Sequence, residues 1–472
     1  MKRLPSTKWL REKILERGRA RDSLQYLQLH SSTLASYTDL ESFALSTNDA
    51  DAPTRTGIEF HFVALRSALV RELWSRQFFI GTTVVDGLLF DVLRAGIQKP
   101  VLRLLEVIRD HGLHHPGLLV FPTHSFGIMA AGFLHSYSST RVEYAAPEHG
   151  LMLCPQTNDL QRTLDVLRRA CAQLQIARRI PQELIEHWYR SRTDWLTKNP
   201  LLLVRTQAYS GSYYENEFLI MTKLRVATAT FSMLAVLQRT PSDPAGLGFS
   251  SRSVNNFETL NIRHYIVLYA DPSNRSRLDG HCVPMHMNPS TMAEESELGF
   301  DFDPRQWRRR NETVDQVHKA VTDVQQGFVR FSFGLDSQSP QGRIYRKLYE
   351  SLSFFRRSFH RVDSGWSCVV SLAVAFEMLL TDSYSSGVRD RVMRRVGMLL
   401  KGVRGVRKFT TEVGHLYEAR GGIVHKGSSH LEFEMNSAQT AFVLAFIRLV
   451  SRLPRFNPRS ATPLRDLCGD TE

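Results

Sequence analysis

The sequence is poor in cysteine and lacks the cysteine spacings typical of metal sites and disulfide frameworks. Its five cysteines are an odd number in a chain of 472 residues, and no Cys-x-x-Cys pair occurs. This excludes a disulfide-rich secreted scaffold and predicts a reducing, intracellular compartment. The five are Cys154, Cys171, Cys282, Cys368 and Cys468.

The short motifs of several common chemistries are also missing. The sequence has no Walker phosphate loop, no GxGxxG dinucleotide signature, no GxSxG elbow and no HExxH zinc motif. The run from His281 to His286 brings two histidines close to Cys282, but a zinc site needs about four ligands and no second pair has a matching spacing. We interpret this run as loop residues, and we predict neither a bound metal nor a cofactor.

Long apolar runs are absent as well. The longest, Trp366 to Leu380, is shorter than the ~18–20 residues that span a bilayer, and it contains Glu377. The basic N-terminus, Met1 to Pro5, has no apolar run behind it and so predicts no secretory signal. No segment combines a Lys/Arg-rich face with a wide aromatic one. The sequence therefore predicts a cytoplasmic protein without a membrane partner.

Acidic residues are under-represented, and the resulting charge is unevenly spread. The chain carries a formal charge of +13, and residues 341–455 contribute +10 of it, with 19 Lys and Arg against 9 Asp and Glu. A basic surface attracts phosphate-rich partners, which favours RNA. For any single cation a solvated helix face is the alternative. The candidate RNA-binding residues are Arg394, Arg395, Lys408 and Lys426.

The length predicts two or three domains. The N-terminal region has a basic segment at 1–56 and a mixed α/β region at 57–334, to which no role is assigned. A Ser, Gly, Pro and Asn-rich joint lies near 241–256. Periodicity predicts helices over 57–112 and 158–199 and strands at Leu118–Phe121 and His264–Tyr269, and it leaves 201–240 open between strand and helix.

A valine seam precedes the clearest linker. Asn311 is placed to cap an amphipathic helix whose valines recur at 3-4-3 spacing up to Gly327, where the helix is predicted to end. This seam can pack within the chain or against a helix of a partner. The linker follows at 334–342.

Beyond the linker the pattern is helical throughout, up to a short tail at 456–472. Short connections join segments with helical periodicity, which predicts an all-α bundle of four to five helices. The fold class expected for the whole chain is therefore α+β, mostly α. The predicted helices run over about 343–360, 366–381, 387–400, 410–427 and 436–454.

The fourth of these helices carries the candidate catalytic residues. Arg420 has a permanent charge that can hold a phosphate, and His425 can move a proton near neutral pH. RNA is cut without metal when its 2′-hydroxyl attacks the adjacent phosphodiester, and this pair suits that reaction.

The spacing of the pair sets a geometric problem. Five positions on an ideal helix turn through about 500°, which leaves the two side chains about 140° apart. Either the helix loosens, at Gly421–Gly422 or after His425, or two subunits complete the site together. Glu377 is costly to bury unless paired, and Arg420 is its expected partner. The alternative is that Glu377 only bridges neighbouring helices.

The string from Leu416 to Gly427, together with Ala375–Leu380 upstream, resembles the C-terminal half of a HEPN domain of the Apea-like branch. The resemblance covers about 341–455. It implies a metal-independent endoribonuclease with catalytic Arg420 and His425 and an orienting Glu377. It also implies a composite site in a homodimer and a role in defence or toxin-like growth control, with the N-terminal region sensing a trigger.

One departure from the family's pattern affects activity. Active members commonly carry a polar residue directly after the Arg, where this sequence has Gly421–Gly422. A non-catalytic HEPN module that binds RNA or dimerises therefore stays open as the alternative.

Overall fold

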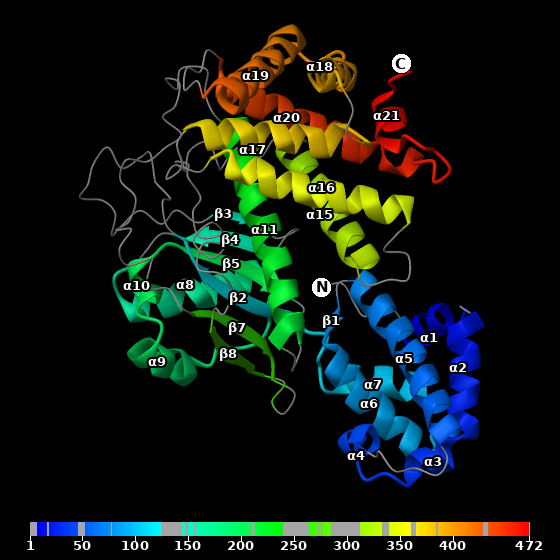
Figure 1. The fold of residues 1–472 in the computed structure, drawn as a ribbon. Coiled ribbons are helices and arrows are strands. Elements are labelled where there is room, and N and C mark those ends of the chain that lie inside the picture. Colours follow the sequence, from blue (N-terminus) through cyan, green and yellow to red (C-terminus); the bar gives the residue numbers. More distant parts are fainter. Residues whose placement is uncertain are drawn as a thin grey trace.

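The computed structural model shows a mostly helical chain with one small antiparallel sheet, which confirms the predicted α+β, mostly α class (Figure 1). The residues that the structure describes are 7–16, 18–45, 52–76, 78–123, 144–146, 150–154, 157–206, 208–209, 213–238, 264–271, 274, 276–284, 312–332, 339–359, 365–383, 386–427 and 433–471.

The N-terminal residues form a lobe of helices. Apolar positions of α2 and α5, among them Leu27, Leu65 and Leu69, are fully buried, and the two helices pack against each other. Pro100 begins α7 at its first turn, where its missing N–H costs nothing. The helices predicted over 57–112 are confirmed. The helices of this lobe are α1 (Thr7–Leu15), α2 (Gly18–Leu29), α3 (Ser31–Ala35), α4 (Leu40–Leu45), α5 (Ala52–Ser75), α6 (Thr82–Arg94) and α7 (Pro100–Asp110).

A six-stranded sheet follows, with the order β3-β4-β5-β2-β7-β8. Every neighbouring pair in it is antiparallel. The strands predicted at Leu118–Phe121 and His264–Tyr269 are confirmed as β2 and β7. The strands are β2 (Gly117–Pro122), β3 (Tyr144–Ala146), β4 (Leu151–Cys154), β5 (Leu201–Thr206), β7 (His264–Ala270) and β8 (Leu278–Pro284), and β1 (Phe79–Ile80) pairs separately and in parallel with β6 (Ala208–Tyr209).

Both faces of this sheet are covered by helices. Leu118 and Val120 of β2 are buried with residues of α8 (Leu160–Gln173), α9 (Gln182–Ser191) and α10 (Trp195–Lys198). Leu119 and Phe121 join the main core on the opposite face, where α11 (Tyr213–Gln238) lies (Figure 1). Because both faces are buried, β2 is apolar at successive positions and shows no polar alternation.

The open stretch 201–240 contains both kinds of element, since β5 and β6 lead into the long helix α11. The loop expected from His281 is wrong, because His281 and Cys282 lie in β8 and pair in register with Val267 and Ile266 of β7. No group of three metal-binding residues occurs in the described part of the chain. His286 and the joint near 241–256 lie outside the described residues.

The C-terminal half is a helical bundle. Ser339 caps α16, its hydroxyl accepting the Gly342 N–H at 3.0 Å, and Pro340 occupies the first turn. The predicted helices are present, with ends shifted by a few residues. They are α15 (Glu312–Ser332), α16 (Pro340–Arg357), α17 (Gly365–Leu380), α18 (Val388–Leu399), α19 (Val406–Lys426) and α20 (Met435–Ser451), followed by the 3-10 turn η2 (Leu453–Arg455) and α21 (Pro463–Cys468).

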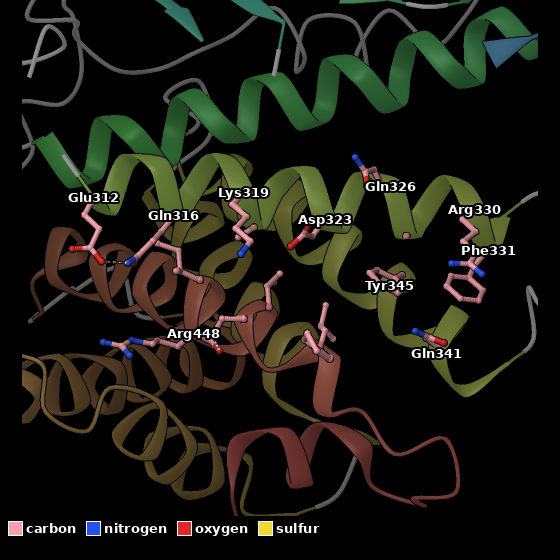
Figure 2. Close-up of a pocket in the computed structure, with 17 residues that line it drawn as sticks. Glu312, Gln316, Lys319, Asp323, Gln326, Arg330, Phe331, Gln341, Tyr345 and Arg448 are labelled. Atoms are coloured by element: carbon pink, nitrogen blue, oxygen red, sulfur yellow. Dashed lines mark hydrogen bonds between the residues drawn. The ribbon is translucent and has the colours of Figure 1, made fainter. Parts of the chain in front are cut away.

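The valine seam packs within the chain. Val314, Val317 and Val321 are buried, and α15 contacts α11, α16 and α20. The predicted stop at Gly327 is wrong, because α15 continues to Ser332. A Cβ at Gly327 would clash with the edge of the Tyr345 ring of α16, which lies against α15 in Figure 2. The glycine therefore permits a close helix contact, and the bundle includes α11 and α15 as well as residues 341–455.

The segment predicted as a tail is fixed to the bundle by buried charge. The Asp470 carboxylate is fully buried and accepts hydrogen bonds from Arg394 at 3.0 and 3.1 Å and from Arg395 at 2.8 Å. The Asp382 carboxylate accepts the backbone N–H groups of Leu464 and Arg465, at the start of α21. Residues 456–471 are therefore part of the folded domain.

One described helix passes a membrane-span test by length and composition. The window Ile220–Leu237 of α11 is apolar enough, but 83% of it is buried inside the fold. The core helix of a soluble protein meets the same criteria, so this helix is weak evidence of membrane insertion.

The contact at Gly327 predicts the effect of a single methyl group. Gly327→Ala should lower the free energy of unfolding by about 1–3 kcal/mol, because the Tyr345 ring cannot give way without disturbing the α15–α16 contact. Gly87→Ala in α6 meets no atom within 4 Å and should stabilise by about 0.5–1 kcal/mol. Urea unfolding of both variants is the measurement, and equal midpoints for the two would contradict the contact.

The charge cluster at the C-terminus predicts a larger loss. Asp470→Asn should cost about 3–5 kcal/mol, since the buried Arg395 guanidinium would lose the nearer of its two carboxylate partners and keep only Asp382, at 3.7 Å. Asp165→Asn removes a carboxylate that is 56% exposed and should change stability by less than about 0.5 kcal/mol. Thermal unfolding compares the two, and an Asp470 variant as stable as the control would show that the segment contributes little.

Candidate active site

The candidate site lies where α17 and α19 run side by side. Arg420 of α19 forms an ion pair with Glu377 of α17, with 3.1 Å between Nη1 and Oε1. One turn earlier on α19, the Tyr417 hydroxyl donates to the Ala373 carbonyl of α17 at 3.2 Å. The expected partnership of Glu377 with Arg420 is confirmed.

Burial and nearby positive charges have opposite effects on the Glu377 carboxyl. Its side chain is 22% exposed, and burial raises the pKa of its carboxyl above the ordinary value, while Arg420 and Arg391 act in the opposite direction. Tyr417, buried beneath the pair, has a pKa raised well above its usual range by burial and by the nearby Glu377 carboxylate. The two guanidinium groups therefore oppose the effect of burial on the Glu377 carboxyl without fully offsetting it.

Arg391 of α18 is a member of this cluster that the sequence does not point out. It is one of several arginines on α18, and nothing in their spacing shows which of them approaches Glu377. Only the register of α18 against α17 and α19 selects it. The sequence indicates a role for Arg391 only through the basic character of the whole of α18.

Arg420 and His425 point in different directions. The helix α19 is unbroken from Val406 to Lys426, so the loosening considered at Gly421–Gly422 does not occur. The Arg420 side chain is 36% exposed and turned toward Glu377, whereas His425 is exposed in the last turn. The angle of about 140° expected for an ideal helix therefore applies. Within one chain the two groups do not face a common point.

The four candidate RNA-binding residues fall into two groups. Lys426 and Lys408 are exposed, and Lys408 forms an ion pair with Glu434 at 2.7 Å. Arg394 and Arg395 instead bind Asp470, and Arg395 is 4% exposed. The expectation that Arg395 faces RNA is corrected, because its guanidinium is buried and holds the C-terminal segment in place.

A separate groove lies on the other side of α20. It has a volume of about 680 Å³ and is bounded by α15, α16, α20 and η2. In Figure 2, Lys319 and Asp323 point from α15 toward this space. Burial raises the pKa of Asp323, and burial together with Asp323 raises that of Tyr345. Its charged lining residues have both signs, so the groove lacks the uniformly basic lining that a phosphate chain favours. They are Glu312, Lys319, Asp323, Arg330 and Arg448.

The raised pKa of Glu377 predicts how stability depends on pH. Between the ordinary carboxyl pKa of 4.5 and the higher folded value, the folded state binds more protons than the unfolded state. The stability of the wild type should therefore fall relative to Glu377→Gln as the pH rises above 4.5. Urea midpoints measured from about pH 4 to pH 8 test this.

The matched control is Glu418→Gln, which removes a carboxylate of α19 that is 53% exposed. Because this exposed ion pair contributes little to stability, Glu418→Gln should change the urea midpoints by far less than Glu377→Gln does. A wild type that gains stability over Glu377→Gln as the pH rises would show that the two arginines outweigh burial.

Comparisons of the chain with models of protein families, with curated proteins and with solved structures found no match.

Proposed function

We propose that this protein is a metal-independent endoribonuclease of HEPN type, with Arg420 and His425 at a composite site in a homodimer. The observation that carries the proposal is the ion pair between Arg420 and Glu377. It holds a permanent positive charge at the surface of the bundle, on the helix that ends in an exposed His425.

The roles of the residues follow from the chemistry of RNA. The 2′-hydroxyl loses its proton and attacks the adjacent phosphorus, the bond to the 5′-oxygen breaks, and that oxygen takes up a proton. His425 transfers a proton in this exchange. Arg420 stabilises the additional negative charge on the phosphorane. The products are a 2′,3′-cyclic phosphate and a 5′-hydroxyl.

A second copy of the chain answers the geometric problem. Since Arg420 and His425 diverge on one rigid helix, a phosphate between them needs the His of one subunit and the Arg of the other. A two-fold axis beside α19 brings such groups together twice, once for each subunit.

A non-catalytic RNA-binding or dimerisation module is the second candidate. The same divergence of Arg420 and His425 along an unbroken helix favours it, as does glycine in place of a polar residue after Arg420. Such a protein would keep the bundle and its basic surface without turnover.

The direct test is cleavage of end-labelled RNA in excess EDTA. The wild type should produce cyclic-phosphate ends, and His425→Ala should lose at least about a hundredfold in rate with little loss of stability, because His425 is exposed. Arg420→Ala is combined with Glu377→Gln, so that no half-buried carboxylate is left without its partner. A DNA of the same sequence should stay intact. A folded wild type that leaves every RNA uncut favours the non-catalytic module.

Mixing the two inactive proteins tests the composite site. After subunit exchange, a heterodimer of His425→Ala with Arg420→Ala/Glu377→Gln has one site with both groups intact. Random pairing should then restore about a quarter of the wild-type activity. A mixture as inactive as its components would place both groups within one chain.

A further inference from the structure

The turn between α18 and α19 directs its basic residues outward. Gly402 and Gly405 adopt a positive φ of 85°, which suits glycine, and they bend the chain tightly between the two helices. Val403, Val406 and Phe409 recur at every third position and pack on the core. The residues between them therefore face solvent.

Two of these outward residues are the cations Arg404 and Arg407, and a third cation, Lys401, lies at the start of the turn. All three are exposed, and none forms an ion pair with a residue in the part of the chain that the structure describes. Their neighbour Lys408 is already paired with Glu434. Three cations close together in a tight turn, with no acidic residue between 401 and 411, form a concentrated positive surface.

The basic turn shares a helix face with His425. Arg407 precedes His425 by 18 positions, which is five full turns of an α-helix, so both project from one side of α19 about 27 Å apart. Thr411 and Glu418 lie exposed between them on this side. The Glu418 carboxylate is paired with Arg389 of α18 at 2.6 Å and so presents little free negative charge.

This side of α19 lies beside the contact between α19 and α18. In Figure 1 the two helices are at the outer edge of the bundle. Halfway along, Met393 of α18 lies against Gly414. The strip therefore begins at the basic turn, passes the Arg389–Glu418 pair and ends at His425 and Lys426. Its length matches about eight nucleotides of a stacked strand, which rises ~3.4 Å per nucleotide.

We propose that Lys401, Arg404 and Arg407 bind the phosphate backbone of single-stranded RNA whose scissile phosphate lies at His425. The inference rests on the proposed function for its ligand and adds the surface that holds the strand. Because the turn lies far from His425, only RNAs long enough to reach both can use it. Its contacts are to phosphates, so it does not select a base sequence.

Binding of an uncleavable RNA tests this surface independently of catalysis. Full-length Lys401→Glu/Arg404→Glu/Arg407→Glu is titrated with a fluorescent 2′-O-methyl RNA of about 20 nucleotides and with one of about four, which is too short to span ~27 Å. The triple substitution should weaken the longer RNA at least about tenfold and lower the salt slope by about 2, from three lost contacts at about 0.7 each. Binding of the short RNA should change little.

The matched control is Arg21→Glu/Lys99→Glu/Arg162→Glu, which changes net charge equally at three exposed cations of the N-terminal half. It should bind both RNAs as the wild type does. Equal loss in both triple variants would overturn the proposal, because only net charge would then matter. Retained binding of the longer RNA by the turn variant would also overturn it, as would turn-dependent binding to phosphatidylserine vesicles with no RNA binding by the wild type.

The outcomes separate this inference from the proposed nuclease. Turn-dependent RNA binding by a wild type that never cuts RNA supports the surface and rejects the nuclease. RNA cleavage by a wild type whose RNA affinity is unchanged by substitutions in the turn supports the nuclease and rejects the proposed binding surface.

Discussion

The unbroken α-helix from Val406 to Lys426 is the constraint on which the candidate chemistry depends. Because its residues advance by a fixed angle and a fixed rise, it turns Arg420 toward α17 and leaves His425 in solvent. The same periodicity places Arg407 above His425 five turns away. A kink at Gly421 would have allowed a site within one chain, and because the helix is continuous the proposed nuclease requires a second subunit.

The Glu377–Arg420 pair has a cost that explains its surroundings. A carboxylate on the apolar helix α17 loses hydration, and one guanidinium does not fully offset that loss, as the raised pKa of Glu377 shows. Arg391 approaches from α18, and the pair stays partly open to water. The arrangement keeps a positive charge oriented at the surface, which a free arginine on an exposed helix would not do.

The basic charge of residues 341–455 performs two different tasks. The buried Arg395 and the partly exposed Arg394 fix the C-terminal segment through the buried Asp470 carboxylate. Lys401, Arg404 and Arg407 face outward from a turn whose partly buried valines pack on the core. Net charge alone therefore overstates how much of this region can meet a polyanion.

The sequence by itself determined the helices of the C-terminal half, the strands β2 and β7 and the need of Glu377 for a cationic partner. These follow from local periodicity and from the cost of burying an unpaired carboxylate, which any compact fold must respect. The tertiary structure alone decided that Gly327 is a helix contact, that His281 lies in a strand and that Arg395 is buried. Each depends on a partner distant in the chain, respectively Tyr345, β7 and Asp470, and no local pattern specifies such a partner.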